Sequence, residues 1–219
     1  MKNNWWKILA VVLLVYSIVA GLLIEVPRLA ILNETIRNLF FHVPMWFSMI
    51  MLLLLSCIAS VRYLLKMDSK LDLQAVEWAN IGIMFGVLGI LTGMFWAKFT
   101  WGDYWTNDPK LNGSAIGLLI YLAYFVLRGS LEDEQQRARI SAVYNIFAFA
   151  TLIPLLFILP RMYDSLHPGN GGNPGFNSYD LDSRLRMVFY PAVIGWILFG
   201  VWVGTIRYRL RLIQERVNG

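Results

Sequence analysis

Six long apolar runs dominate the sequence, and the charged residues gather between them. Each run approaches the roughly 20 residues that a helix needs to cross the hydrocarbon core of a bilayer. The runs cover residues 6–26, 44–65, 78–97, 112–127, 140–159 and 185–206. This pattern predicts an all-α, polytopic membrane protein, in which residues 1–219 form a single domain built as a bundle of six transmembrane helices.

The composition agrees with a lipid-facing surface. The chain is 58% hydrophobic and 15% charged, whereas a soluble domain carries roughly a quarter charged residues. A formal net charge of +5 is compatible with nucleic-acid binding, but the cations lie in short loops and form no long basic patch. We therefore expect the lipid bilayer, and no nucleic acid, as a partner.

Lysine and arginine are distributed unevenly across the predicted membrane. About 12 of the 19 lie on the side of the N-terminus and about 7 on the other side. Because cytoplasmic loops carry the excess of these residues, we expect both termini in the cytoplasm. The outward loops then cover residues 27–43, 98–111 and 161–184, while the inner loops, 66–77 and 129–139, are expected to be short, solvated turns.

Four glycines of the third apolar run recur at spacings of 4, 3 and 4, namely Gly82, Gly86, Gly89 and Gly93. This spacing places them on one face of a helix. Small residues on one face let two membrane helices approach closely. The pattern favours close packing within the chain, and a docking face for another subunit is the alternative.

The chain has two histidines, His42 and His167, and both fall in predicted outward loops. Either one alone is most simply a solvated loop residue. As a pair on one side of the membrane, two neutral imidazoles can supply both axial ligands of a haem iron. Cys57 is the only cysteine and no CxxCH motif occurs, so a haem would be held without thioether bonds.

The second outward loop is rich in aromatic residues, with Trp101, Tyr104 and Trp105 close together. Enrichment of Trp and Tyr at membrane interfaces accounts for one or two of them. The cluster offers a flat apolar platform that suits a porphyrin. Arg37 and Lys110 are outward cations that are candidates to meet the porphyrin carboxylates.

This loop, residues 99–112, resembles the tryptophan-rich "WWD" signature, roughly WGxxWxWDxRLT, of haem-handling proteins of cytochrome c biogenesis. Five positions match the signature: Trp101, Gly102, Trp105, Asp108 and Leu111. The flanking segments resemble the CcmC type within that family. His42-Val43-Pro44, followed by Trp46, is similar to its first outer-loop histidine motif, and Leu166-His167 before a glycine-rich stretch is similar to its third.

Three positions depart from the signature. The third tryptophan is Asn107, the arginine is Lys110 and the closing threonine is Asn112. An aromatic platform and a cation survive these changes. Lysine lacks the bidentate fork of arginine, so Lys110 would meet a propionate as a point charge.

The resemblance implies a binding protein rather than an enzyme. It implies that haem b is held transiently at the outer face of the bacterial inner membrane, with His42 and His167 as axial ligands. Haem would then be presented to a periplasmic haem chaperone for maturation of c-type cytochromes. The family works with ATP-binding cassette transporter subunits and a small membrane subunit. No GxxxxGK[ST] motif occurs in the chain, so any ATPase activity would come from those partners.

Three alternatives remain open at this stage. A membrane cytochrome b-type electron carrier also uses paired histidines, usually placed within helices that face each other. A haem lyase of the same WWD family is closer, although such relatives carry more helices and more histidines. A transporter that moves a substrate through the bundle is the third, since Pro154 and Pro191 could kink the last two helices.

Overall fold

The computed structural model describes residues 4–28, 31–167 and 181–218, and every regular element in these residues is helical. The elements are α1 (Trp5–Leu23), the 3-10 helix η1 (Asn33–Asn38), α2 (Leu39–Lys66), α3 (Ser69–Trp101), α4 (Pro109–Gly129), α5 (Glu134–Ile153), the π-helical turn η2 (Pro154–Ile158), α6 (Leu159–Met162) and α7 (Ser183–Asn218). Six segments of the described chain are long and apolar enough to cross a membrane. The predicted all-α bundle of six membrane-length helices is confirmed.

The helices extend beyond the apolar runs at several ends. Helix α3 begins at Ser69 rather than near residue 78, and its first turn is capped by the Asp68 side chain, which accepts a hydrogen bond from the Lys70 N–H at 3.0 Å. The loop between α2 and α3 therefore shrinks to Met67 and Asp68. Hydropathy marks only the part of a helix that lies in lipid, so it misses helical turns that carry charge.

Charged residues of these extra turns are paired inside the bundle instead of lying in solvated turns. The Asp72 carboxylate contacts the Arg128 guanidinium at 2.6 Å, which joins α3 to α4. The buried Glu77 carboxylate contacts Arg207 at 2.7 Å and Arg211 at 3.3 Å, which joins α3 to α7. The expectation of a solvated turn over residues 66–77 was wrong, because residues distant in sequence supply counter-charges.

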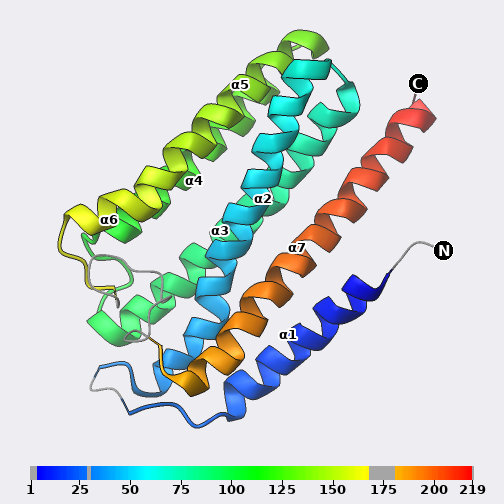
Figure 1. Ribbon diagram of the computed structural model, residues 1–219. Helices are drawn as coiled ribbons and strands as arrows, with labels where there is room; N and C mark the ends of the chain where they lie inside the picture. The colour runs from blue at the N-terminus through cyan, green and yellow to red at the C-terminus, as the bar shows by residue number, and fades with distance from the viewer. Residues whose placement is uncertain (1–3, 29–30, 168–180, 219) are drawn as a thin grey trace.

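Helices α2 and α3 run side by side through the middle of the bundle (Figure 1). Side chains of α2 lie over the glycine face of α3 in antiparallel order. A Cβ atom would lie 2.8 Å from Leu53 at Gly82, 2.7 Å from Met49 at Gly86, 2.8 Å from Trp46 at Gly89 and 2.7 Å from His42 at Gly93. The predicted packing of this face within the chain is confirmed, and the same register brings His42 onto Gly93.

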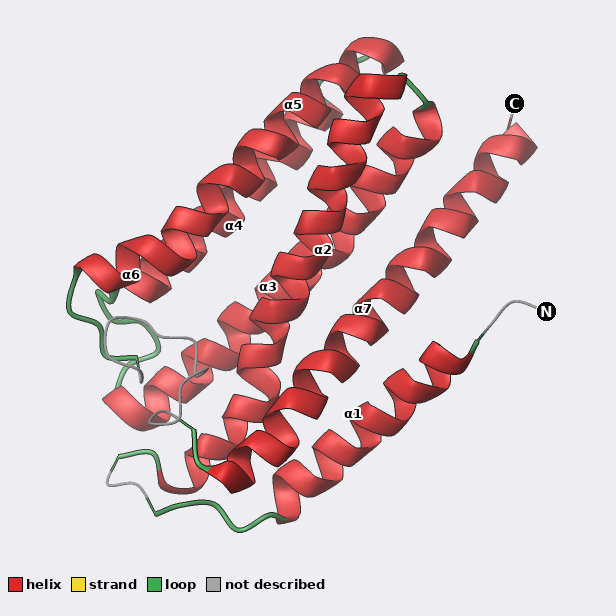
Figure 2. Ribbon diagram, in the orientation of Figure 1, coloured by secondary structure: helices red, strands yellow, loops and turns green. Residues whose placement is uncertain are grey.

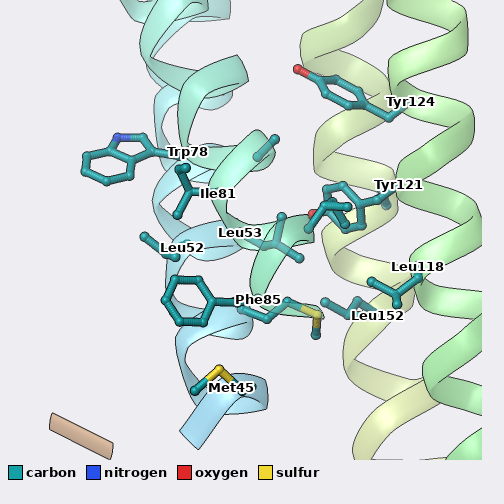
Figure 3. Close-up of a cluster of buried hydrophobic side chains, with 14 of the residues drawn as sticks. Met45, Leu52, Leu53, Trp78, Ile81, Phe85, Leu118, Tyr121, Tyr124 and Leu152 are labelled. Atoms are coloured by element: carbon teal, nitrogen blue, oxygen red, sulfur yellow. The ribbon is translucent and has the colours of Figure 1, made fainter. Parts of the chain in front are cut away.

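The main hydrophobic core fills the space between the α2–α3 pair and the α4–α5 pair and extends to the face of α3 that packs against α7 (Figure 3). Phe85 of α3 and Tyr121 of α4 are fully buried in it. Helix α1 packs mainly against α7 at the edge of the bundle, as Figure 2 shows. Only Ala10, Ser17 and Gly21 of α1 are buried. Helix α1 is therefore peripheral, whereas α7 packs against both α2 and α3.

Candidate functional site

His42 lies within helix α2 and not in a loop, which corrects its predicted position. The 3-10 helix η1 leads directly into α2, so His42 stands in the first turns of the helix and is buried. Its imidazole lies against Gly93, where a Cβ atom would come within 2.7 Å of Cε1. Glycine at this position therefore provides the space that the ring occupies.

The hydrogen bonds of His42 decide which ring nitrogen faces other partners. Nδ1 lies 3.0 Å from the Gly89 carbonyl oxygen and 3.2 Å from Thr92 Oγ1. A carbonyl oxygen only accepts, so Nδ1 donates, and Nε2 carries the free lone pair. This tautomer is the one that a metal-binding histidine adopts when its other nitrogen is held by an oxygen.

Two indole rings stand edge-on to His42. The ring centroid of Trp46 lies 6.2 Å away and that of Trp96 lies 5.7 Å away. Trp96 is itself fixed, because its Nε1 donates to Thr35 Oγ1 at 3.2 Å. Sequence reasoning missed Trp96. It follows Gly93 by three residues on the glycine face of α3, and that spacing could have identified it.

His167 lies beyond α6 and is held by Asp108, which precedes α4. His167 Nδ1 donates to Asp108 Oδ1 at 3.0 Å, which again leaves Nε2 as the free nitrogen. The Trp101 ring stands edge-on to the imidazole at a centroid distance of 5.0 Å. The WWD-like loop and the third outward loop thus meet at His167.

Asp108 is the hub of this contact, and its side chain is fully buried. Oδ1 also accepts from the N–H groups of Lys110 at 2.9 Å and Leu111 at 3.3 Å, which makes Asp108 the N-cap of α4. Oδ2 accepts from Ser165 Oγ and from the Leu166 N–H, each at 2.8 Å. One carboxylate therefore fixes both the start of α4 and the segment that carries His167.

Burial and hydrogen bonding set the charge of this pair. Burial, together with the charge of Lys110, lowers the pKa of His167 by more than the neighbouring Asp108 raises it, so the imidazole is neutral at pH 7. Burial by itself would raise the pKa of Asp108. Hydrogen bonds from His167, the Leu166 N–H and Ser165 outweigh that effect and hold the pKa well below its ordinary value. The contact joins a carboxylate to a neutral imidazole.

Both histidines line the same cavity. Its volume is about 300 Å³, and Gly93, Trp96 and Trp101 also line it. A second cavity of about 150 Å³ shares His42, Gly93, Trp96 and His167 with the first. It continues among apolar residues of α2, α3 and η2, with Lys110 in its wall. The larger cavity reaches the lower end of the size range of small-molecule sites, about 300 Å³, and its mostly apolar lining is typical of them.

Comparison with known proteins identifies the family of the chain. The CcmC family, described as heme exporter protein C, matches residues 2–219. The chain belongs to this family. Three relatives bear the name "Heme exporter protein C". The protein of Bradyrhizobium diazoefficiens is 29% identical over 85% of this chain and 70% of its own length.

The other two relatives cover different shares of the chain. The protein of Rhodobacter capsulatus is 27% identical over 94% of this chain and 84% of its own length. That of Haemophilus influenzae is 24% identical over 72% of this chain and 63% of its own length. Together with six membrane-length helices, these bacterial relatives identify a multi-pass protein of the inner membrane.

The aromatic residues of the WWD-like loop are not all at the cavity. Trp101 lines the larger cavity, whereas Tyr104 and Trp105 are exposed and line neither of the two. Tyr104 lies 6.0 Å, between ring centroids, from Phe95. Gly102 ends α3 at a φ of 91°, a conformation that side chains rarely adopt. The structure thus brings one aromatic of the predicted platform to the histidines and leaves two at the surface.

The two predicted cations also separate. Lys110 lines the smaller cavity. Arg37 lines neither cavity, and its Nη1 donates to the carbonyl oxygens of Gly21 at 2.9 Å and Ile24 at 2.7 Å. Arg37 Nε donates to Glu34 at 2.7 Å. Its guanidinium therefore caps the end of α1.

Two of the departures from the signature contact each other. The Asn112 side-chain amide donates to Asn107 Oδ1 at 2.8 Å. Asn112 Oδ1 in turn accepts from Trp105 Nε1 at 3.3 Å. Asn107 therefore fastens the loop to the first turn of α4 through its hydrogen bond with Asn112.

Proposed function

We propose that this chain binds haem b, non-covalently and transiently, between His42 and His167 at the outer face of the inner membrane. Membership of the CcmC family indicates a role in haem handling for cytochrome c biogenesis. One observation carries the finer assignment. Two imidazoles from separate elements line one cavity, and each donates through Nδ1 to an oxygen, which leaves Nε2 free to bind iron.

The residues around the cavity fit a porphyrin. Neutral imidazoles are the ligand form that iron binds, and His167 is neutral at pH 7. Trp96 and Trp101 give the larger cavity aromatic walls, and the apolar walls of the smaller one suit the hydrocarbon rim of the ring. Lys110 is the cation that supports propionate contact. When bound, haem contributes an iron that accepts two axial ligands.

The chain would present this haem to a periplasmic haem chaperone that feeds c-type cytochrome maturation. The ATP-binding cassette subunits and the small membrane subunit would be its membrane partners. The chain's own task is to bind and release haem, and no side chain takes part in bond making within the porphyrin.

The test is the absorption spectrum of protein purified in detergent. His42→Ala and His167→Ala each lower the haem recovered per chain and change the low-spin spectrum, and the double variant retains none. Transfer to a periplasmic haem chaperone is followed in the same samples by separating the two proteins. Asp103→Asn, an exposed change in the same outward region, is the control. Full haem with an unchanged spectrum in the double variant would refute the ligand assignment.

A membrane cytochrome b-type electron carrier is the second candidate, because His42 lies within a helix as the ligands of such carriers do. Redox titration with a quinol discriminates between the two functions. Reversible electron transfer without release of haem to the chaperone favours the carrier. Release of haem to the chaperone favours the proposed function.

A further inference from the structure

The two histidines donate to different kinds of oxygen. His42 Nδ1 donates to a backbone carbonyl, that of Gly89, at 3.0 Å. His167 Nδ1 donates to a buried carboxylate, that of Asp108, at the same distance. Hydrogen bonds to ionised acceptors are roughly twice as strong as neutral ones. A carboxylate partner also raises the basicity of a metal-binding histidine.

We propose that Asp108 is a positioning residue that makes His167 the stronger of the two axial ligands. By drawing on the Nδ1 proton, the carboxylate increases electron density at Nε2 and strengthens the bond from Nε2 to iron. His42 is then the ligand that a competing group displaces first. This inference rests on the proposed function and adds an order to its two ligands.

The surroundings of Asp108 hold its carboxylate in the orientation that this role needs. Four further donors contact it, the N–H groups of Lys110, Leu111 and Leu166 and the hydroxyl of Ser165. The side chain has no exposed surface, so water does not compete for its oxygens. A carboxylate fixed from two chain segments cannot swing away from His167 without breaking the N-cap of α4.

Asp108→Asn changes the charge of the side chain while it keeps the size and shape nearly the same. Asparagine is as good an N-cap as aspartate, and its side-chain oxygen can still accept from His167 Nδ1. Asp108→Asn therefore removes the negative charge and keeps the contacts that Oδ1 accepts. The amide Nδ2 that replaces Oδ2 cannot accept from the Leu166 N–H, so the retained bis-histidine spectrum is the check that His167 keeps its place. Asp103→Asn removes a charge from the same outward region at an exposed position, and it is the matched control.

The first experiment reads each iron–histidine bond alone. In the ferrous state, His42→Ala leaves His167 as the single protein ligand, and His167→Ala leaves His42. We expect the iron–histidine stretching frequency in resonance Raman spectra to be higher in His42→Ala than in His167→Ala. Adding Asp108→Asn to His42→Ala should lower its frequency toward that of His167→Ala. Equal or reversed frequencies would overturn the inference.

The second experiment keeps both ligands and measures the midpoint potential of the bound haem. A more anionic ligand stabilises ferric iron, so Asp108→Asn should shift the potential upward, while Asp103→Asn leaves it unchanged. The wild-type spectrum comes first. If it lacks a bis-histidine low-spin signature, the proposed function fails. If that signature is present and Asp108→Asn matches Asp103→Asn in potential, only the inference fails.

Discussion

Gly93→Ala tests whether the packing of α3 against His42 sets the position of an axial ligand. The added Cβ atom would lie 2.7 Å from His42 Cε1 and 3.2 Å from Nδ1. Ordinary van der Waals contact begins at 3.4 Å, so restoring it moves the ring by about 0.7 Å. Ligand geometry at a functional site must be held within about 0.5 Å. The substitution therefore exceeds what the site tolerates.

The expected effect on stability is small beside the effect on haem. Overpacking costs about 1–3 kcal/mol, and replacing glycine by alanine within a helix recovers about 1 kcal/mol. The net loss of stability is therefore about 0–2 kcal/mol. The bond from His42 Nδ1 to the Gly89 carbonyl, 3.0 Å in the native chain, is stretched as the ring moves. Loss of such an outer partner lowers metal affinity about 10–100-fold.

The assay measures haem affinity by titration of the detergent-purified protein, with circular dichroism to confirm helix content. Gly82→Ala is the matched control, because its Cβ atom would lie 2.8 Å from Leu53 Cδ2 in the same α2–α3 interface, away from the histidines. Gly129→Ala, where nothing lies within 4 Å, controls for helix propensity. A Gly93→Ala protein with wild-type haem affinity would refute the reasoning.

Four further substitutions test the surrounding structure. Arg37→Gln should lower the thermal midpoint by uncapping α1, while haem affinity stays within about twofold. Lys110 is half-buried in the wall of the smaller cavity, so Lys110→Gln should weaken haem binding by about 1.5–3 kcal/mol, the range of a hydrogen bond to a charged group. Equal loss of haem in both variants would show that Arg37 also contacts the haem. Asn145→Ala removes buried hydrogen bonds to Ser56 and Ser60 at 2.7 and 2.8 Å. Unfolding in detergent should show a destabilisation of about 0.6–1.7 kcal/mol, and an unchanged unfolding midpoint would contradict this prediction. Gly102→Ala places a side chain in the left-handed region of backbone conformation and should destabilise the protein by about 1–2 kcal/mol. Wild-type stability of this variant in the same unfolding assay would contradict the prediction.

Much of the fold follows from local properties of the sequence. The number of helices follows from hydropathy, because burying a stretch of apolar side chains in lipid depends mainly on that stretch. The glycine face of α3 was likewise readable from spacing. The ends of helices were less predictable. Asp72 and Glu77 lie in helical turns that are stabilised by Arg128, Arg207 and Arg211, whose distance along the chain hides the pairing.

The candidate site shows the same division. The sequence by itself determined that two histidines and a tryptophan-rich loop belong to one end of the bundle, because membrane crossings assign each loop to a side. Only the tertiary structure decided which groups meet there. It joins Asp108 to His167, brings Trp96 to His42, and uses Arg37 to cap α1. Hydrogen bonds and ring contacts act over a few ångströms, so their partners depend on how distant segments pack and not on local composition.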